Sequence, residues 1–121
     1  MSGVDDISLE PVYINTVDSN PVIKWGTHNY ATFGFSVAGT VTTGTFIIEG
    51  TEDGATWDEL PIYTGTVQLP NNEVVDTGSY RVDISGFALI RLVPDTFTGN
   101  VRITPNLSKR IFVPNAVVLG G

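Results

Sequence analysis

Short runs in which apolar and polar residues alternate, separated by turn-forming residues, constrain the fold of this chain most strongly. In the run 30–38 the apolar side chains fall on every second position, at Ala31, Phe33, Phe35 and Val37. A period of two places such residues on one face of a β-strand. Gly, Pro, Asn and Asp recur at intervals of roughly 8–12 residues, which is the spacing of short antiparallel strands. The pattern predicts an all-β fold.

Composition points the same way, because valine, isoleucine and threonine make up about a third of the 121 residues and their branched side chains suit a pleated sheet. We expect eight or nine short strands in a two-sheet antiparallel sandwich, with a jelly roll as the leading topology. Asp53-Gly54 lies between apolar runs and predicts a tight hairpin turn. The predicted strands are 12–14, 22–25, 30–38, 45–51, one that begins at Trp57, 80–84, 87–93, 101–103 and a last candidate at 111–113.

The same alternation predicts which side chains form the hydrophobic core. Residues that keep a period of two within their strands are expected to face the interior. They are Phe33, Phe35, Phe46, Ile48, Trp57, Tyr80, Val82, Ile90 and Leu92.

The length of 121 residues corresponds to one domain. We expect a body of about residues 22–110, an N-terminal arm of about 1–21 and a C-terminal arm of about 111–121. The first residues carry acidic side chains and no basic start before an apolar run, so they do not resemble a secretory signal. No apolar run approaches the roughly 20 residues that span a bilayer, and we expect a soluble protein.

Charge and rare residues disfavour several classes of function. The formal net charge is −7, whereas nucleic-acid grooves and anionic membranes attract clustered Lys and Arg. The chain has no cysteine and one histidine, His28, which leaves little for nucleophilic, acid–base or zinc chemistry. We therefore expect no nucleic-acid or membrane partner, no catalytic residue, no cofactor and no metal. His28 itself is interpreted as a turn residue.

Other polar clusters have structural interpretations that we prefer. The acidic residues around the Asp53-Gly54 turn resemble a solvated hairpin tip more than a calcium loop, whose ligands alternate and include a distal Glu. Arg81, Arg91 and Arg102 fall opposite the apolar positions, where cross-strand ion pairs are a more ordinary use than a basic binding stripe. Trp25 and Tyr63 are the candidates for a sugar-stacking platform.

The C-terminal arm is the strongest candidate for an interaction site. After Arg110 it carries no charge and is mostly apolar, so an exposed arm would promote aggregation. It must pack on its own domain or on a neighbouring subunit, and the two alternatives are close to even. The candidate interface residues are Ile111, Phe112, Val113, Val117, Val118 and Leu119.

Two runs resemble a signature of small β-sandwich proteins from tailed-bacteriophage particles. Residues 44–57 form an aromatic-aliphatic strand followed by a Ser/Thr-x-Asp-Gly-x-x-Trp hairpin. Residues 80–92 resemble the second half, a Tyr-x-Val-Asp-x-x-Gly-aromatic-x-x-Ile/Val-Arg-Leu run, and 98–103 resembles its terminal hairpin strand. The resemblance covers about residues 30–104. It implies a structural or accessory protein of the virion and carries over no catalytic residue.

The expectation that follows is a non-enzymatic head decoration (cement) protein on the outer capsid surface. Its partners would be the major capsid protein or other virion proteins, with homo-oligomers of the chain itself, and it would be found in virions assembled in the host cytoplasm. A tail, baseplate or fibre component is the alternative of the same class. An alternative of another class is a carbohydrate-binding module that uses Tyr63, with Ca²⁺ at Asp53 or Asp58.

Overall fold

Two long antiparallel strands organise the fold in the computed structural model, which describes residues 6–15 and 22–111. They are β4 (Thr32–Thr51) and β9 (Leu89–Ser108), and they pair with each other along almost their whole length. The sequence patterns predicted each of them as two short strands. The predicted strands 30–38 and 45–51 correspond to the two halves of β4. The predicted strand 101–103 lies wholly in β9, and 87–93 lies in β9 from Leu89 on.

Glycines at the middle of both strands explain why the chain bends there without ending the pairing. Gly44 in β4 and Gly99 in β9 have φ angles of 90° and 143°, which side chains with a Cβ rarely adopt. A Cβ on Gly44 would overlap the backbone of Phe97, and a Cβ on Gly99 would overlap the carbonyl oxygen of Thr40. The register shifts near Val41 and Thr43 mark the same place. These glycines therefore form a bulged bend rather than a turn between strands.

The remaining strands add to the edges of this pair, and every pairing is antiparallel. Three strands join β9, and β5 and β8 join β4. The hairpin of β6 and β7 extends the sheet beyond β8, and a short 3₁₀ turn follows it. The bounds are β1 (Asp6–Ser8), β2 (Val12–Asn15), β3 (Ile23–Gly26), β5 (Asp58–Glu59), β6 (Tyr63–Thr64), β7 (Val67–Gln68), η1 (Pro70–Asn72) and β8 (Gly78–Asp83).

The predicted all-β, antiparallel class is confirmed, and the described residues contain nine strands in one sheet. The jelly-roll topology remains a prediction. Residues 6–8 and 12–15, which the sequence placed in an N-terminal arm, pair with β9 as strands of the sheet.

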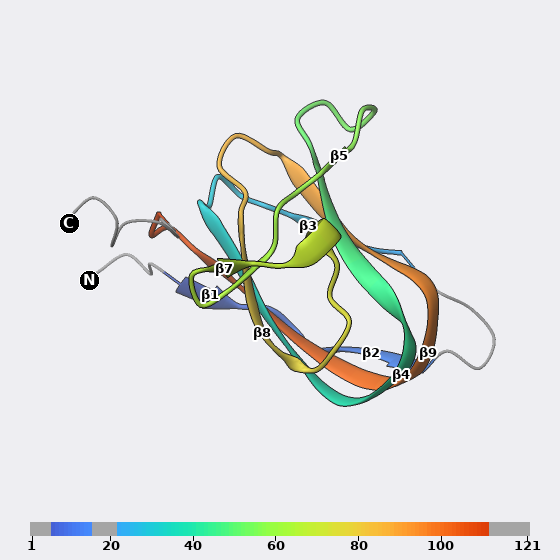
Figure 1. Ribbon diagram of the computed structural model, residues 1–121. Coiled ribbons are helices and arrows are strands. Elements are labelled where there is room, and N and C mark those ends of the chain that lie inside the picture. Colours follow the sequence, from blue (N-terminus) through green and yellow to red (C-terminus); the bar gives the residue numbers. More distant parts are fainter. Residues whose placement is uncertain (1–5, 16–21, 112–121) are drawn as a thin grey trace.

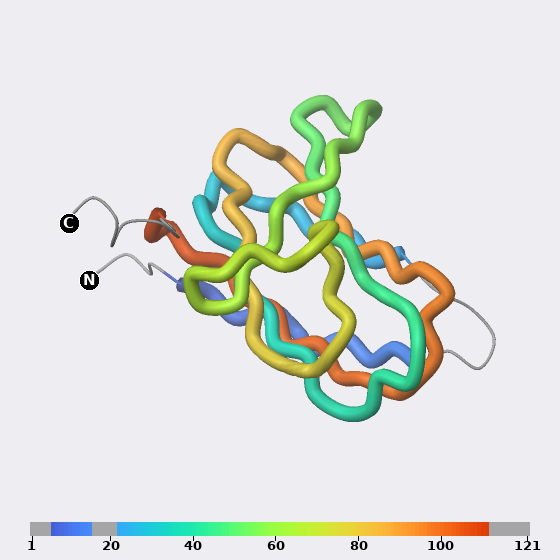
Figure 2. The backbone as a smooth tube through the Cα atoms, in the orientation of Figure 1, coloured from blue at the N-terminus to red at the C-terminus, as the bar shows by residue number. Residues whose placement is uncertain are grey.

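Because β4 and β9 bend together, the single sheet closes into two layers (Figures 1 and 2). The first layer holds β1, β2, the second half of β9, the first half of β4, and β8 with the β6–β7 hairpin. The second layer holds β3, the first half of β9, the second half of β4, and β5.

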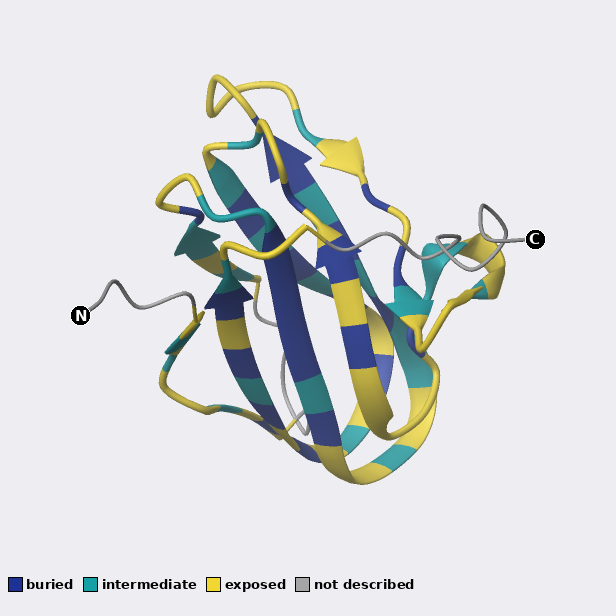
Figure 3. Cartoon of the chain, turned by 90° about the vertical axis from the view of Figure 1, so that its left-hand side faces the viewer, coloured by how far each residue is buried: buried dark blue, intermediate teal, exposed yellow. Residues whose placement is uncertain are grey.

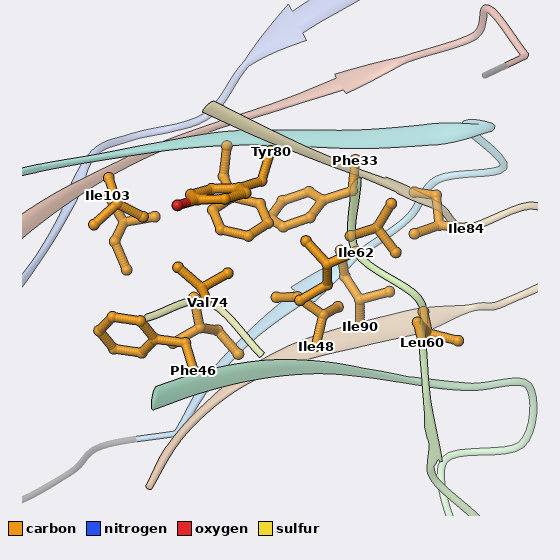
Figure 4. Close-up of a cluster of buried hydrophobic side chains, with 14 of the residues drawn as sticks. Phe33, Phe46, Ile48, Leu60, Ile62, Val74, Tyr80, Ile84, Ile90 and Ile103 are labelled. Atoms are coloured by element: carbon orange, nitrogen blue, oxygen red, sulfur yellow. The ribbon is translucent and has the colours of Figure 1, made fainter. Parts of the chain in front are cut away.

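The core lies between the two layers, where side chains from both halves of β4 meet (Figure 4). Along β8 and β9 buried residues alternate with more exposed ones, whereas the first residues of β4 are buried on both faces, as Figure 3 shows by colour. The rings of Trp25 and Phe33 pack across the two layers with centroids 5.0 Å apart, and those of Phe46 and Phe97 pack near the bend with centroids 4.5 Å apart. Eight of the nine predicted core residues are buried: Phe33, Phe35, Phe46, Ile48, Tyr80, Val82, Ile90 and Leu92.

The prediction that Trp57 belongs to the core is wrong. Trp57 lies just before β5 at the end of the acidic hairpin and is partly exposed. Its ring stacks on the guanidinium group of Arg91, with 4.0 Å between Arg91 Cζ and the ring centroid. Leu60 and Ile62, which follow in the chain, fill the interior at this level instead.

Candidate functional site

Both described ends of the chain meet at one corner of the first layer. Asp6 at the start of β1 pairs in register with Ser108 at the end of β9, and its carboxylate forms an ion pair of 2.8 Å with Arg110. The Arg110 backbone is held as well, because its carbonyl oxygen accepts a hydrogen bond of 2.7 Å from the hydroxyl of Thr32. Figures 1 and 2 show the start of β1 and the end of β9 on the same side of the body.

Electrostatics at this corner favour the ionised form of Asp6. The hydrogen bond from the Ser108 side chain, with a further contribution from the charge of Arg110, lowers the pKa of Asp6 below its ordinary value of 3.8. The ion pair is solvent-exposed, so it contributes little to folding stability by itself. Its effect is to fix where residues 108–111 leave the sheet.

Ile111 is the one predicted interface residue that the structure describes. It is 74% exposed, which is unusual for an isoleucine. The other predicted interface residues, Phe112, Val113, Val117, Val118 and Leu119, lie outside the described residues. The interface assigned to the C-terminal arm therefore stays a prediction, to which the structure adds the point of departure.

A groove of about 880 Å³ crosses the outer face of the first layer and begins at this corner. Its floor consists of outward-facing residues from β1, β9, β4 and β8, in rows set by the strand register. The rim includes Asp6, Arg110 and Ile111 at one end, Arg81 on β8, and the Gly65-Thr66 turn of the β6–β7 hairpin. The floor residues are small and polar: Ser8, Thr32, Gly34, Ser36, Ser79, Thr104, Asn106 and Ser108.

Gly34 keeps the middle of the groove floor flat. It lies in register between Asn106 on β9 and Arg81 on β8. A Cβ at this position would lie 2.7 Å from the side-chain oxygen of Asn106, which shows that the Asn106 side chain lies across the glycine. Gly34 is consequently buried although it belongs to the outer face.

The outer face of the second layer is built from long charged side chains. In the strand register Lys24 on β3 lies beside Arg91 on β9, and Arg91 lies beside Glu49 on β4. Arg91 and Glu49 form an ion pair of 2.7 Å, in which the two side chains are 26% and 20% exposed. With Trp57 stacked on Arg91, this face is covered by its own side chains. The predicted cross-strand ion pair is confirmed for Arg91.

The acidic hairpin is a hydrogen-bonded turn. The Asp53 carboxylate accepts hydrogen bonds from the backbone N–H groups of Ala55 at 2.8 Å and Thr56 at 2.9 Å, and from the hydroxyl of Thr51 at 3.1 Å. The two backbone bonds, Thr56 first, lower the pKa of Asp53. Glu59 accepts a bond from Asn72. Among residues 6–15 and 22–111, no three His, Asp or Glu side chains gather as a metal-ligand group.

The residues considered for sugar stacking or base chemistry lie apart from one another. Trp25 is on β3 in the second layer and packs against Phe33. Tyr63 is on β6 in the first layer, next to Arg81. His28 is exposed in a turn with a φ angle of 52°, as the sequence predicted.

The groove is the site that sequence reasoning missed. Its signal is present in the outward positions of one predicted strand, 30–38, where Thr32, Gly34 and Ser36 are all small. These residues form a groove only because β1, β8 and β9 add small outward residues to the same rows. Pairing between strands that are distant in the chain cannot be predicted from a single sequence. The residues singled out by charge and aromaticity lie mostly elsewhere.

Comparison with known proteins gives one structural likeness. A scan against protein-family models finds no match, and a search of curated proteins finds none either. Among solved structures, the chain is similar to the SPBc2 prophage-derived protein YomS, with a TM-score of 0.61 and 11% sequence identity over 88% of this chain and 97% of that one. At this identity the likeness shows a shared fold. In the described part of the chain, no helix has the length and apolar character needed to cross a membrane.

Proposed function

We propose that this protein is a non-enzymatic structural protein of a tailed-bacteriophage virion and that it decorates the outer surface of the head. In this proposal its partners are the major capsid protein and further copies of itself. Its location is the virion, which assembles in the host cytoplasm.

The observation that carries the proposal is the match of nearly the whole fold to a protein of prophage origin. The sequence resemblance of residues 44–57 and 80–92 to small sandwich proteins of phage particles points to the same class. The two observations are independent, since one rests on backbone geometry at low identity and the other on residue patterns.

The position of the chain ends favours a decoration protein over a tube or fibre component. Subunits that stack into a tube or fibre need two different surfaces, one for each neighbour along the axis. Here Asp6 and Arg110 hold both described ends at one corner, beside the groove. An attachment concentrated at one corner suits a small body that sits on a preformed shell.

Binding to isolated phage structures tests the proposal. Purified protein is titrated onto capsids that lack it, onto tails, and onto a glycan array. We expect saturable co-sedimentation with capsids at a fixed copy number per major capsid protein. Saturable binding to tails alone would contradict the head assignment, and binding to glycans without binding to either particle would support a carbohydrate-binding module instead.

A further inference from the structure

The groove on the first layer borders the last described residues of the chain, after which the C-terminal segment 112–121 follows in the sequence. The last described residues, Arg110 and Ile111, form part of the groove rim, and the bond from Thr32 to the Arg110 carbonyl fastens the chain to the groove floor. The segment therefore starts at the edge of a concave surface.

The segment 112–121 is long enough, when extended, to cross such a groove. Ten residues in extended conformation span at most about 33–36 Å. The floor from Thr32 to Ser36 covers four residue steps of β4, or roughly 13–14 Å. A segment that begins at one groove can therefore cross to the equivalent groove of an adjacent molecule.

The floor offers the hydrogen bonds that an extended segment requires. A chain lying on the face of a sheet cannot bond to the sheet backbone, because the strand ladders already use those groups. The hydroxyls of Ser36, Ser79 and Thr104 make no hydrogen bond within the described part of the chain, so they can serve the backbone of an occupant. At the centre of the floor the Asn106 side chain lies across Gly34, and its amide can donate and accept hydrogen bonds there.

Charge also fits. The segment after Arg110 contains no charged side chain. At the rim, Asp6 and Arg110 neutralise each other across 2.8 Å. The hydroxyl and amide floor is uncharged, so a neutral segment buries no unpaired ion there.

We propose that the groove of each copy receives residues 112–121 of a second copy, an inference that rests on the proposed oligomeric decoration protein. Two molecules whose grooves face each other across a two-fold axis bring each segment, from its own rim, onto the floor of the partner. Such an exchange is self-complementary and closes after two copies. It gives the apolar segment a covered position and makes the dimer the unit that meets the capsid.

Cysteine cross-linking in the full chain tests the exchange, and the absence of native cysteine makes each introduced thiol unique. Ser36→Cys on the groove floor and Val117→Cys in the segment are prepared as separate proteins, one carrying a size tag, and are mixed and oxidised. The matched control is Thr42→Cys with Val117→Cys, since Thr42 is exposed on the same strand but outside the groove. We expect the Ser36–Val117 heterodimer to form about ten-fold faster than the control.

Each other outcome overturns the exchange. If a chain that carries both Ser36→Cys and Val117→Cys forms only an intramolecular disulfide, the segment lies in the groove of its own molecule. Equal cross-linking rates for Ser36→Cys and Thr42→Cys would show that the segment does not lie in the groove. Because no capsid is present in this assay, its failure is separate from failure of the decoration proposal.

Filling the groove gives a second test that does not depend on thiol chemistry. Ser36→Trp places a large ring on the floor, whereas Thr42→Trp adds the same ring outside it. Sedimentation equilibrium is expected to show self-association weakened about ten-fold by Ser36→Trp and unchanged by Thr42→Trp, with native circular dichroism for both. Unchanged association of a folded Ser36→Trp protein would overturn the proposal.

Discussion

The two outer faces of the folded sheet differ although the same two strands build both. On the second layer, Arg91 is paired with Glu49 and covered by Trp57, so long side chains satisfy one another. On the first layer, the corresponding positions of β4 are Thr32, Gly34 and Ser36, and the surface is a groove.

The difference shows which face is closed by the chain itself. The cross-strand ion pair of Arg91 with Glu49 and the stacked ring of Trp57 leave few groups on the second layer for a partner. Small residues on the first layer leave a hollow, and among its described hydroxyls those of Ser36, Ser79 and Thr104 are open to a partner, whereas those of Thr32 and Ser108 bond to Arg110. We therefore assign stability to the second outer face and binding to the first.

The largest expected effect comes from the interior that both faces share. Phe33→Ala removes a fully buried ring that contacts Trp25 from the other layer, and such a truncation costs about 3–5 kcal/mol. Urea denaturation should show the loss. A change of a few tenths of a kcal/mol would mean that the layers do not pack through Phe33.

A smaller effect is expected at the second outer face. Arg91→Ala removes both the ion pair with Glu49 and the stacking on Trp57, and should lower the free energy of unfolding by about 1–2 kcal/mol. Binding to capsids should be preserved. The comparison of the two faces fails if Arg91→Ala leaves stability intact and abolishes binding. Trp57→Ala should reproduce part of the stability loss, below the cost of a core aromatic.

On the first outer face we expect a substitution to weaken association and to leave stability nearly unchanged. Ser79→Ala removes one exposed hydroxyl from the groove floor, and its effect on stability should lie within about 0.5 kcal/mol. The expected change is in self-association, measured by sedimentation. A Ser79→Ala protein that is clearly less stable than the native chain would show that the floor supports the fold rather than an occupant.

The smallest effect concerns pH at the rim of the groove. Because the folded-state pKa of Asp6 lies below 3.8, its ionised form favours the fold; this contribution is present above about pH 3.8 and is lost as the pH falls through the lower folded value. Carboxyl-carbon NMR titration should place this pKa below 3.8. Ser108→Ala and Arg110→Gln should each raise it, and a pKa that Ser108→Ala leaves unchanged would contradict the assigned cause.

Local patterns predicted much of this fold, and pairing explains the rest. Alternation in residues 30–38 and 80–84 identified buried positions correctly because each strand has one inward face. Gly39 to Gly44 was interpreted as a corner between strands, since glycine with threonine suits a turn as well as a bulge; the pairing with β9 decides between them. Trp57 was placed inside because size and periodicity favoured it, whereas its actual partner, Arg91, is 34 positions further along the chain. The groove could not be predicted from the sequence, because it forms only when β1, β4, β8 and β9 pair in register.

The most direct test of the account is the occupancy of capsids by a chain that ends at Arg110. This truncation keeps every strand of the described fold, the Asp6–Arg110 pair and the groove floor, and it removes the predicted interface segment together with Ile111 of the rim. Capsids lacking the protein are incubated with the full or the truncated chain, and bound copies are counted after co-sedimentation. The account predicts native circular dichroism, a smaller sedimenting species and loss of capsid binding for the truncated chain. A truncated chain that occupies capsids at full stoichiometry would contradict it.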